Sequence, residues 1–596
     1  MSDDQSTEHA RSQGPWPMVA GLAGAVLVAG GVVLALYSQF VAAPIPVPFD
    51  SYAETGDFPA RLVRGTLIFA GAIVLIGAVV LVRGRRGDER GAGITASGVL
   101  ALLAVLIGGI VFAVTAHIPS TYQRLTSVFV VTPRVPSAIA ALTLAVLGAV
   151  LIFVHVATPT AAAPRRSALA AALVVGIVPV LGAAGIAVRL GDDTAATDHA
   201  TADPGPDAAV PAVLGPERFR LQLPAARSNK DTRIVFTGTG FVVSTRVGIT
   251  LYDGVTGAER WHYRRLGVSA DNVENVPNET RAFPGENVVL TYWAKRGWMA
   301  FDSVTGELLW TEGDFTRESN VIIRGYLSDF TRANDVIVRG HLLATTSARG
   351  TVTRYDARTG RSMWTTPTEP SDCASTSERV VASMTTIYRA ATCGAGETAT
   401  VAVTAFDPQS GEVRDRRGLP TPRVESSADI EVRVLDSGFV WMTCRHDGAG
   451  TELLLPPNAP LSSAIVDSRR DDLRVHAADN DVLVSSANPG GYMLPDRWEV
   501  LSAAEGESTE LDMTTPDGRA QYAEAAALLA DQIVAITLDG GYTLRTWDRS
   551  TGRAGPVLPV TLAQGTRSLR FTTTAGSPVL IATDREHRNI EVIGFG

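Results

Sequence analysis

The sequence predicts two domains, an α-helical membrane domain of five transmembrane helices followed by an all-β, eight-bladed propeller. The membrane domain is predicted by five long apolar runs within residues 1–190. The propeller is predicted by a turn motif that returns at steps of 49, 54 and 51 residues in the C-terminal part of the chain. A chain of 596 residues whose composition changes this sharply holds more than one domain.

Each apolar run has about 20 residues or more, enough to cross a hydrocarbon core of roughly 30 Å as a helix. The runs are Pro17–Tyr37, Leu62–Val82, Ala92–Ala116, Pro136–Ala157 and Ala168–Val188. Their centres hold essentially no ionisable residue, whereas transporters carry polar or charged groups near mid-membrane. Residues 17–190 are therefore predicted to be a transmembrane domain in the lipid bilayer without a transport role. Close packing between its helices is predicted at Gly21, Gly24, Gly176, Gly182 and Gly185.

Arginine-rich short loops predict the orientation of this domain. The loop Arg83–Arg90 and the residues Arg165 and Arg166 connect neighbouring runs. Short loops of this kind stay in the cytoplasm. We therefore expect a multi-pass protein of the cytoplasmic membrane, with residues 1–16 as a cytoplasmic tail and everything after Arg189 outside.

A change of amino-acid composition and hydrophobic pattern separates the membrane domain from the propeller. Residues 191–213 are rich in Ala, Asp, Thr and Pro without an apolar period, which predicts a flexible extracytoplasmic linker. Residues 214–596 alternate short β-branched runs with Gly, Asp, Asn and Pro turns, the pattern of many short strands. Ala520–Ala530 is the exception and is predicted to be a loop or short helix.

The repeated motif has the form aromatic, Asp, two residues, Thr-Gly, three residues, Trp, as in "YDGVTGAERW". Complete copies contain Asp253, Gly257 and Trp261, then Asp302, Gly306 and Trp310, then Asp356, Gly360 and Trp364; copies without the tryptophan contain Asp407 and Gly411, and Asp548 and Gly552. A weaker copy lies at Ser502, and the spacing puts a degenerate copy near Leu455. Repeats of 40–50 residues built from short strands indicate one four-stranded propeller blade each.

Each part of the motif has a structural role. An Asp carboxylate accepts hydrogen bonds from backbone N–H groups two or three residues on, which closes the turn. Gly supplies a positive φ, which lets the hairpin re-enter its strand. Trp is large enough to fill the space between adjacent blades and buries roughly 150–250 Å². The motif therefore predicts blade architecture, and no catalytic residue follows from it.

The spacing also predicts how the ring closes. One period after the Asp548 copy reaches the chain end, so the last blade lacks its outermost strand. The alternating run Arg218–Pro224 has no blade of its own. We predict that it pairs with Asn589–Phe595, which completes the eighth blade from both ends of the domain.

The region from about residue 215 to 596 resembles the pyrroloquinoline-quinone-type propeller repeat, written A-x-D-x-x-T-G-x-x-x-W. The resemblance is carried by "LYDGVTGAERW", "AFDSVTGELLW" and "RYDARTGRSMW", with partial copies in "AFDPQSGEVRD" and "TWDRSTGRAGP". The family implies an eight-bladed ring. Its members include quinoprotein dehydrogenases and non-catalytic relatives such as the outer-membrane assembly lipoprotein BamB.

The resemblance leaves an enzyme as the alternative reading. A membrane-bound glucose dehydrogenase of the family also places five membrane helices before an external propeller. Such enzymes bind the quinone with a calcium ion held by Glu, Asn and Asp, and many alcohol dehydrogenases of the family carry adjacent cysteines, which this chain lacks. No family catalytic, cofactor-binding or metal-binding residue maps onto a matching motif here, so no cofactor is predicted outside this alternative.

Three cysteines, Cys373, Cys393 and Cys444, form no CxxC or CxxxC pair that would suggest a thiolate metal site. An exterior compartment permits disulfides. We predict a Cys373–Cys393 bridge, with Cys444 buried on a strand; a Cys393–Cys444 bridge across neighbouring blades is the alternative.

Charge and composition narrow the functional classes. The net charge is −9 and no basic run is present, which gives no support for nucleic-acid binding. Arginine replaces lysine almost throughout, which suggests GC-rich coding and a bacterial source. The prediction is a non-catalytic propeller that binds or scaffolds a protein or cell-wall partner of the cell envelope, and the alternative is a quinoprotein dehydrogenase that passes electrons to membrane quinone.

Overall fold

The computed structural model divides into two compact units, which are described separately. Unit 1 comprises Met1–Asp198 with Arg265–Asn275, and unit 2 comprises His199–Arg264 with Val276–Gly596. The structure describes residues 16–42, 57–85, 91–128, 130–158, 166–205, 208–223, 232–245, 247–266, 277–293, 297–311, 335–337, 339–347, 351–367, 373–393, 400–420, 430–434, 440–446, 449–455, 460–463, 465–467, 473–478, 481–487, 495–502, 507–513, 523–538, 541–574, 576–584 and 589–596.

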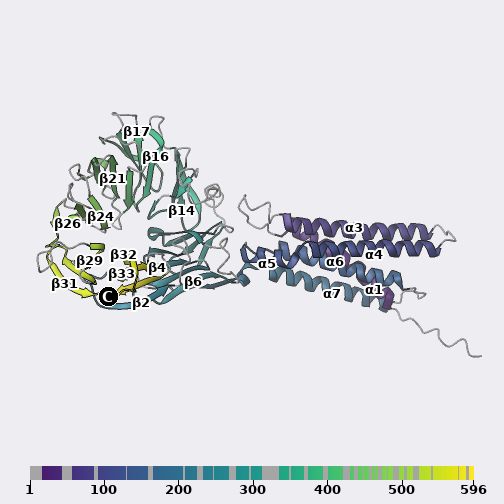
Figure 1. The fold of residues 1–596 in the computed structure, drawn as a ribbon. Coiled ribbons are helices and arrows are strands. Elements are labelled where there is room, and N and C mark those ends of the chain that lie inside the picture. The colour runs from purple at the N-terminus through teal and green to yellow at the C-terminus, as the bar shows by residue number, and fades with distance from the viewer. Residues whose placement is uncertain are drawn as a thin grey trace, which may run out of the picture. The chain divides into compact units, whose positions relative to one another are not determined.

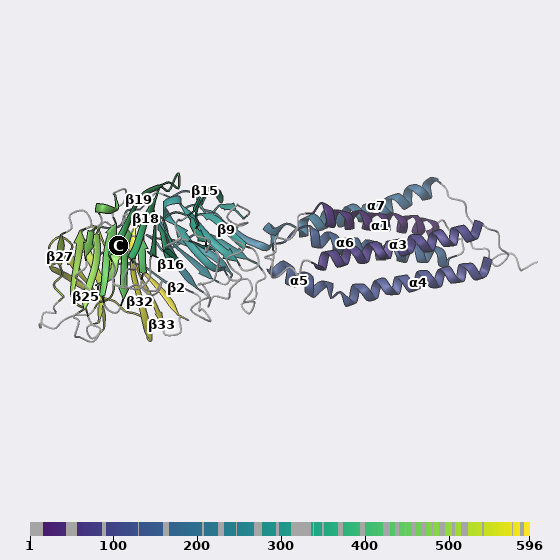
Figure 2. The ribbon, with the colours of Figure 1, turned by 90° about the horizontal axis from the view of Figure 1, so that it is seen from above.

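Unit 1 is helical, and five of its helices are long and apolar enough to cross a membrane, as predicted. Its helices are α1 (Trp16–Phe40), α3 (Asp57–Arg85), α4 (Gly91–Thr115), the short α5 (Ile118–Val128), α6 (Arg134–Ala157) and α7 (Arg166–Leu190). The long helices run alongside one another (Figure 2). A 3-10 turn, η2 (Asp193–Ala196), follows α7.

Glycines bring the helix backbones close together, but at fewer positions than predicted. A Cβ on Gly24 of α1 would lie 2.5 Å from the carbonyl oxygen of Gly148 on α6, so neither position accepts a side chain. Gly21 and Gly176 likewise face a neighbouring helix. The prediction is wrong for Gly182 and Gly185, which have no atom within 4 Å of such a Cβ.

Unit 2 is a β-propeller whose sheets are arranged around a ring (Figure 1). Its described strands form eight sheets, called here the first to the eighth in chain order. The first sheet contains β3 (Arg233–Thr237), β4 (Gly240–Thr245), β5 (Gly248–Asp253) and β6 (Glu259–Arg265), with β1 (Thr197–Ala200) at the edge; the second contains β7 (Pro277–Phe283), β8 (Val288–Trp293), β9 (Gly297–Asp302) and β10 (Leu308–Trp310); and the third contains β11 (Asp335–Ile337), β13 (Ala344–Ser347), β14 (Thr351–Asp356) and β15 (Arg361–Pro367). The fourth sheet contains β16 (Cys373–Ala382), β17 (Ile387–Cys393), β18 (Thr400–Phe406) and β19 (Val413–Pro420), with β12 (Arg339–Gly340); the fifth contains β20 (Ile430–Val434), β21 (Val440–His446), β22 (Ala449–Leu455) and β23 (Ile465–Asp467); and the sixth contains β24 (Leu473–Ala478), β25 (Asp481–Ala487), β26 (Pro495–Ser502) and β27 (Ser508–Glu510). The seventh sheet contains β28 (Ala523–Leu528), β29 (Gln532–Leu538), β30 (Tyr542–Asp548) and β31 (Ala554–Pro559), and the eighth contains β32 (Thr566–Thr574), β33 (Ser577–Asp584), β34 (Ile590–Phe595) and β2 (Glu217–Leu223).

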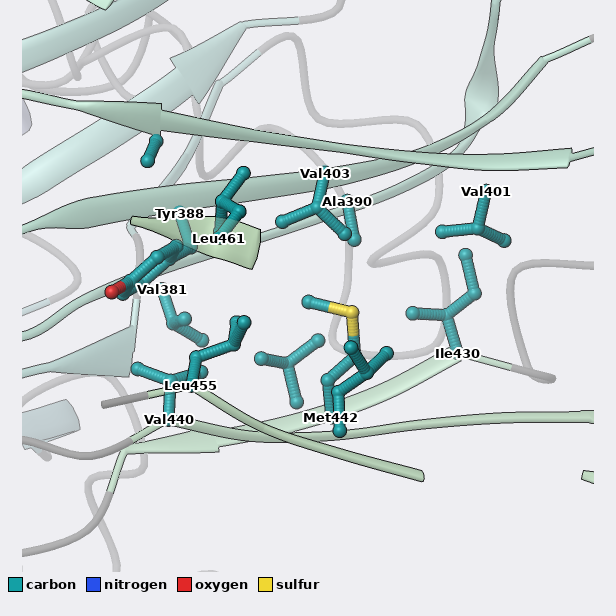
Figure 3. Close-up of a cluster of buried hydrophobic side chains, with 13 residues drawn as sticks. Val381, Tyr388, Ala390, Val401, Val403, Ile430, Val440, Met442, Leu455 and Leu461 are labelled. Carbon is teal, nitrogen blue, oxygen red and sulfur yellow. The ribbon is translucent and has the colours of Figure 1, made fainter. Parts of the chain in front are cut away.

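The first strands of neighbouring sheets contact one another and form the inner wall of the ring. Such contacts join β3 to β7, β16 to β20, β24 to β28 and β28 to β32. Middle strands such as β8, "VVLTYW", are buried at every residue because each sheet has neighbours on both faces. Figure 3 shows one of these contacts, where side chains of the fourth and fifth sheets, including Tyr388, Val403 and Met442, meet in a common core.

The ring closes as the sequence predicts. In seven sheets the main strands come from one stretch of chain, whereas the eighth, called the closing sheet, takes β2 from the N-terminal end of the unit. Strand β2 pairs antiparallel with β34, with Phe219 opposite Gly594 and Leu223 opposite Ile590. The two ends of the propeller sequence are therefore held together by a β-ladder.

The predicted linker at 191–213 contains short elements of secondary structure and makes backbone hydrogen bonds to the propeller. The described part contains η2 and β1, and β1 extends the first sheet. Within unit 2 the Ala202 N–H donates to the Thr305 carbonyl (2.8 Å), and the Asp531 N–H donates to the Ala212 carbonyl (3.0 Å). Composition missed this because backbone hydrogen bonds to neighbouring strands and turns require no apolar period. The prediction of a loop or short helix at Ala520–Ala530 is wrong, since this segment contains strand β28.

Candidate functional site

The motif residues form the turns between the third and fourth strands of a blade. In the first sheet Asp253 Oδ1 accepts hydrogen bonds from the N–H groups of Val255 (3.0 Å) and Thr256 (2.9 Å). The Gly257 N–H donates to the Asp253 carbonyl (2.9 Å), and Gly257 has a φ of 68°. This φ lies in the left-handed region, which favours glycine.

The same turn recurs at the other copies. The carboxylates of Asp302, Asp356, Asp407 and Asp548 each accept two backbone hydrogen bonds, and the φ angles of Gly306, Gly360, Gly411 and Gly552 lie between 66° and 77°. At the weaker copy the Ser502 N–H donates to the Glu507 carbonyl (2.9 Å), the bond that Asp302 makes to Glu307. The degenerate copy predicted near Leu455 lies at the end of β22, and residues 456–459, which would form its turn, lie outside the described residues.

Each motif tryptophan packs on the turn of the following blade. The Trp261 Nε1–H donates to the Ser303 carbonyl (3.3 Å), and a Cβ on Gly306 would lie 2.5 Å from the Trp261 ring. Trp310 repeats this at Ala357 and Gly360, with a 2.8 Å hydrogen bond. The motif glycine thus has a second role, because a side chain there would overlap the incoming indole.

Trp364 follows the same rule on the next turn. Its Nε1–H donates to the Pro408 carbonyl (3.0 Å), and its ring covers Gly411. The two glycine roles, positive φ and close approach, therefore hold at three successive blade junctions.

Junctions without the tryptophan use other chemistry that the sequence pattern does not reveal. After the Asp407 copy, Asp415 takes the Trp position and accepts the Leu461 N–H (2.6 Å), while Arg417 donates to the Leu461 carbonyl (2.6 Å). At the closing sheet Phe219 takes this role, because its ring lies 2.6 Å from where a Gly257 Cβ would be. Phe219 lies in no turn motif, so repeat spacing could not identify it.

Ion pairs also link successive blades. Arg358 donates to Asp302 Oδ2 (2.8 Å), which joins one motif turn to the next. Arg354, almost fully buried, donates to Glu286 (2.5 Å) across the same two sheets. Buried charges of this kind are paired because an unpaired buried charge is costly.

The hydrogen bonds of the turns lower the pKa of their aspartates. The Ser410 N–H, acting against desolvation and together with the Arg414 guanidinium, lowers the pKa of Asp407 to about 2. For Asp302 desolvation raises the pKa, but the Thr305 N–H and Arg358 outweigh it and the net shift is downward. These carboxylates are held ionised as structural acceptors.

The cysteine positions are compatible with the predicted bridge. Cys373 on β16 and Cys393 on β17 are directly opposite each other in the antiparallel ladder. Cys444 lies on β21, as predicted, opposite Ile430 and Thr451. Directly opposed strand residues lie within the Cα separation that a disulfide needs. The bridge itself stays a prediction.

The inner wall carries arginines where the first and eighth sheets meet. Arg570 on β32 lies over the Phe236 ring of β3, with its guanidinium carbon 5.1 Å from the ring centroid. Desolvation lowers the pKa of Arg570 although its side chain is exposed to solvent. The lowered pKa and the exposure are compatible, because neighbouring protein surrounds the guanidinium while water still reaches it. Arg567 is exposed, and Arg233 is half-buried.

No group of His, Cys, Asp and Glu within the described residues could hold a metal ion.

Known proteins resemble parts of this chain. Residues 245–449 match the family model described as outer membrane protein assembly factor BamB. Two similar solved structures are "Structure of Dos1 propeller" (10% identity, TM-score 0.36, covering 64% of this chain and 95% of that chain) and the crystal structure of Saccharomyces cerevisiae Sqt1 (8% identity, TM-score 0.35, covering 64% and 100%). No curated protein matches the chain.

Proposed function

We propose that this chain, whose propeller carries the BamB-type repeat over residues 245–449, is a membrane-anchored binding or scaffolding module with an extracytoplasmic eight-bladed propeller. In this proposal each of the eight sheets is one blade. The partner is a protein or wall polymer of the cell envelope, and no cofactor takes part.

The observation that carries the proposal is how the motif residues are used. Their carboxylates accept the hydrogen bonds that close the turns, and their glycines leave room for the aromatic rings that pack on them. Their tryptophans donate hydrogen bonds to the next blade. This chemistry is consumed in building the ring, which leaves the inner wall and the loops to contact a partner. A rigid ring on a membrane anchor is suited to holding a partner at the membrane surface.

The orientation in this proposal follows from the arginines. Arg83–Arg90 and Arg165–Arg166 are assigned to the cytoplasm, so the five spans leave the propeller outside. Protease added to intact spheroplasts of a bacterial host should degrade the chain after Arg189. Survival of the propeller until the membrane is permeabilised would reverse the orientation.

A crosslinking experiment tests the binding role. Membranes that contain the full chain are crosslinked mildly, and the proteins and polymers retained with it are identified; a chain truncated after Arg189 is the matched control. A partner retained by the full chain but not by the truncated chain supports the proposal. Absorbance of a bound quinone in the purified full chain, with calcium added, would instead support the dehydrogenase.

A further inference from the structure

The meeting line of the first and eighth sheets brings three arginines together on the inner wall. Two contacts align β32 with β3 at one offset: Thr574 Oγ1 donates to the Gly240 carbonyl (2.9 Å), and Arg570 lies over Phe236. Both pairs are separated by 334 residues. The same offset places Arg567 and Arg233 near one level, in the cluster that we call the seam arginines, Arg233, Arg567 and Arg570.

Two features leave these side chains available to a ligand. The ladder between β32 and β33 shifts register between Thr566 and Ser568, so Arg567 has no partner across the ladder, and such a bulge redirects a side chain. Arg570 lies over the Phe236 ring, a contact that uses the π-face of the guanidinium or its charge and does not consume an N–H donor in a hydrogen bond to a described residue.

The charge of the seam differs from that of the inner strand β7. Strands β3 and β32, "RIVFT" and "TRSLRFTTT", contain no acidic residue. On β7, by contrast, Arg281 donates to Glu279 (2.5 Å) on the same strand. The structure shows no ion pair between a seam arginine and any other described residue. The seam is thus a cationic site within a chain whose net charge is −9.

We propose that the seam arginines bind an acidic peptide segment, which names the partner chemistry of the binding module proposed above. Arg567 and Arg570 are three residues apart, so the site extends about 10 Å along the wall. That length suits the successive carboxylates of an extended Asp- or Glu-rich segment better than a single small anion. Arginine forks donate in pairs to each carboxylate, which fixes the orientation of the segment.

Binding of a labelled oligoglutamate peptide to the detergent-solubilised full chain tests this inference by fluorescence anisotropy. R567Q/R570Q removes the charge-assisted hydrogen bonds of two arginines and should weaken binding at least about tenfold. R361Q removes an exposed arginine on the outer strand β15 and serves as the matched control, which should bind as the unchanged chain does. Melting temperatures of all variants verify that they fold.

Several results would overturn the inference. The first is that the unchanged chain does not bind oligoglutamate at low salt. The second is that R361Q loses as much affinity for the peptide as R567Q/R570Q does. The third is that inorganic phosphate competes with the labelled peptide as well as oligoglutamate does. The failure of this inference can be told apart from that of the proposed function. If R567Q/R570Q still retains the crosslinked envelope partner, the seam is not the site but the binding module stands; if the unchanged chain retains no partner, the proposed function itself fails.

Discussion

Replacing Phe219 by Ala should destabilise the propeller at the point where its ring closes. Phe219 is 8% exposed and stacks on Phe241 at a centroid distance of 6.3 Å. It also covers Gly257 and Gly594, at both of which a Cβ would overlap its ring. These two glycines have no side chains that could move into the space that F219A creates.

The magnitude follows from this geometry. Truncation of a buried Phe to Ala costs about 3–5 kcal/mol, and the cost is highest where the surroundings cannot collapse. Large domains lose roughly 2 °C of melting temperature per kcal/mol, so F219A should lower the melting temperature by roughly 6–10 °C. The loss should concentrate in the closing sheet, since β2 is attached to its ring through the β34 ladder.

The assay is thermal unfolding of the full chain in detergent, followed by tryptophan fluorescence, with hydrogen exchange read in β2 and β34. Met363 on the outer strand β15 is 42% exposed, and M363A is the matched control, expected to change stability by no more than about 0.5 kcal/mol. The reasoning is refuted if F219A has the same melting temperature as M363A, or if hydrogen exchange rises equally in sheets remote from the closing sheet.

Three further outcomes are expected. Non-reducing peptide mapping should recover a Cys373–Cys393 bridge; a Cys393–Cys444 peptide or three free thiols would reject it. The pKa of Asp407 is lowered in the folded chain to about 2, so the stability that its carboxylate contributes is complete above the ordinary carboxyl pKa and is lost as pH falls from about 4 to about 2. In D407N the urea concentration at the midpoint of unfolding should therefore depend less steeply on pH across that window. A pH dependence equal to that of the unchanged chain would contradict the assignment. Deleting 199–213 should lower the melting temperature, because this segment bonds to the blades; an unchanged melt would support the prediction of a flexible linker.

The sequence predicts those parts of the fold whose interactions are local. The Asp253 turn is complete within five residues, so its residue types appear side by side and recur with the blade period. The membrane helices are equally local, since length and apolarity alone qualify them. Closure by β2 was predictable because the count of strands left one place open.

Interactions between distant residues were not predictable in this way. Nothing near Phe219 shows that it faces Gly257. The alanine-rich β28 has helical composition, but the neighbouring strands β29 and β32 make it a strand, so tertiary contacts override propensity. The hydrogen bonds of the segment at 191–213 could not be predicted because they are made by backbone groups that every residue carries.

The blade junctions explain why the repeat identifies the architecture but not the ligand. At Gly306 and Gly360 the motif is fixed by one requirement, that an indole from the preceding blade reach the turn. The closing junction joins strands from opposite ends of the unit and satisfies the same requirement with Phe219. Residues on the inner wall meet no such requirement, so their side chains are free to serve recognition. A ligand site is therefore to be sought on the inner strands where charge is left uncompensated, which in the described part of the ring leads to the seam arginines.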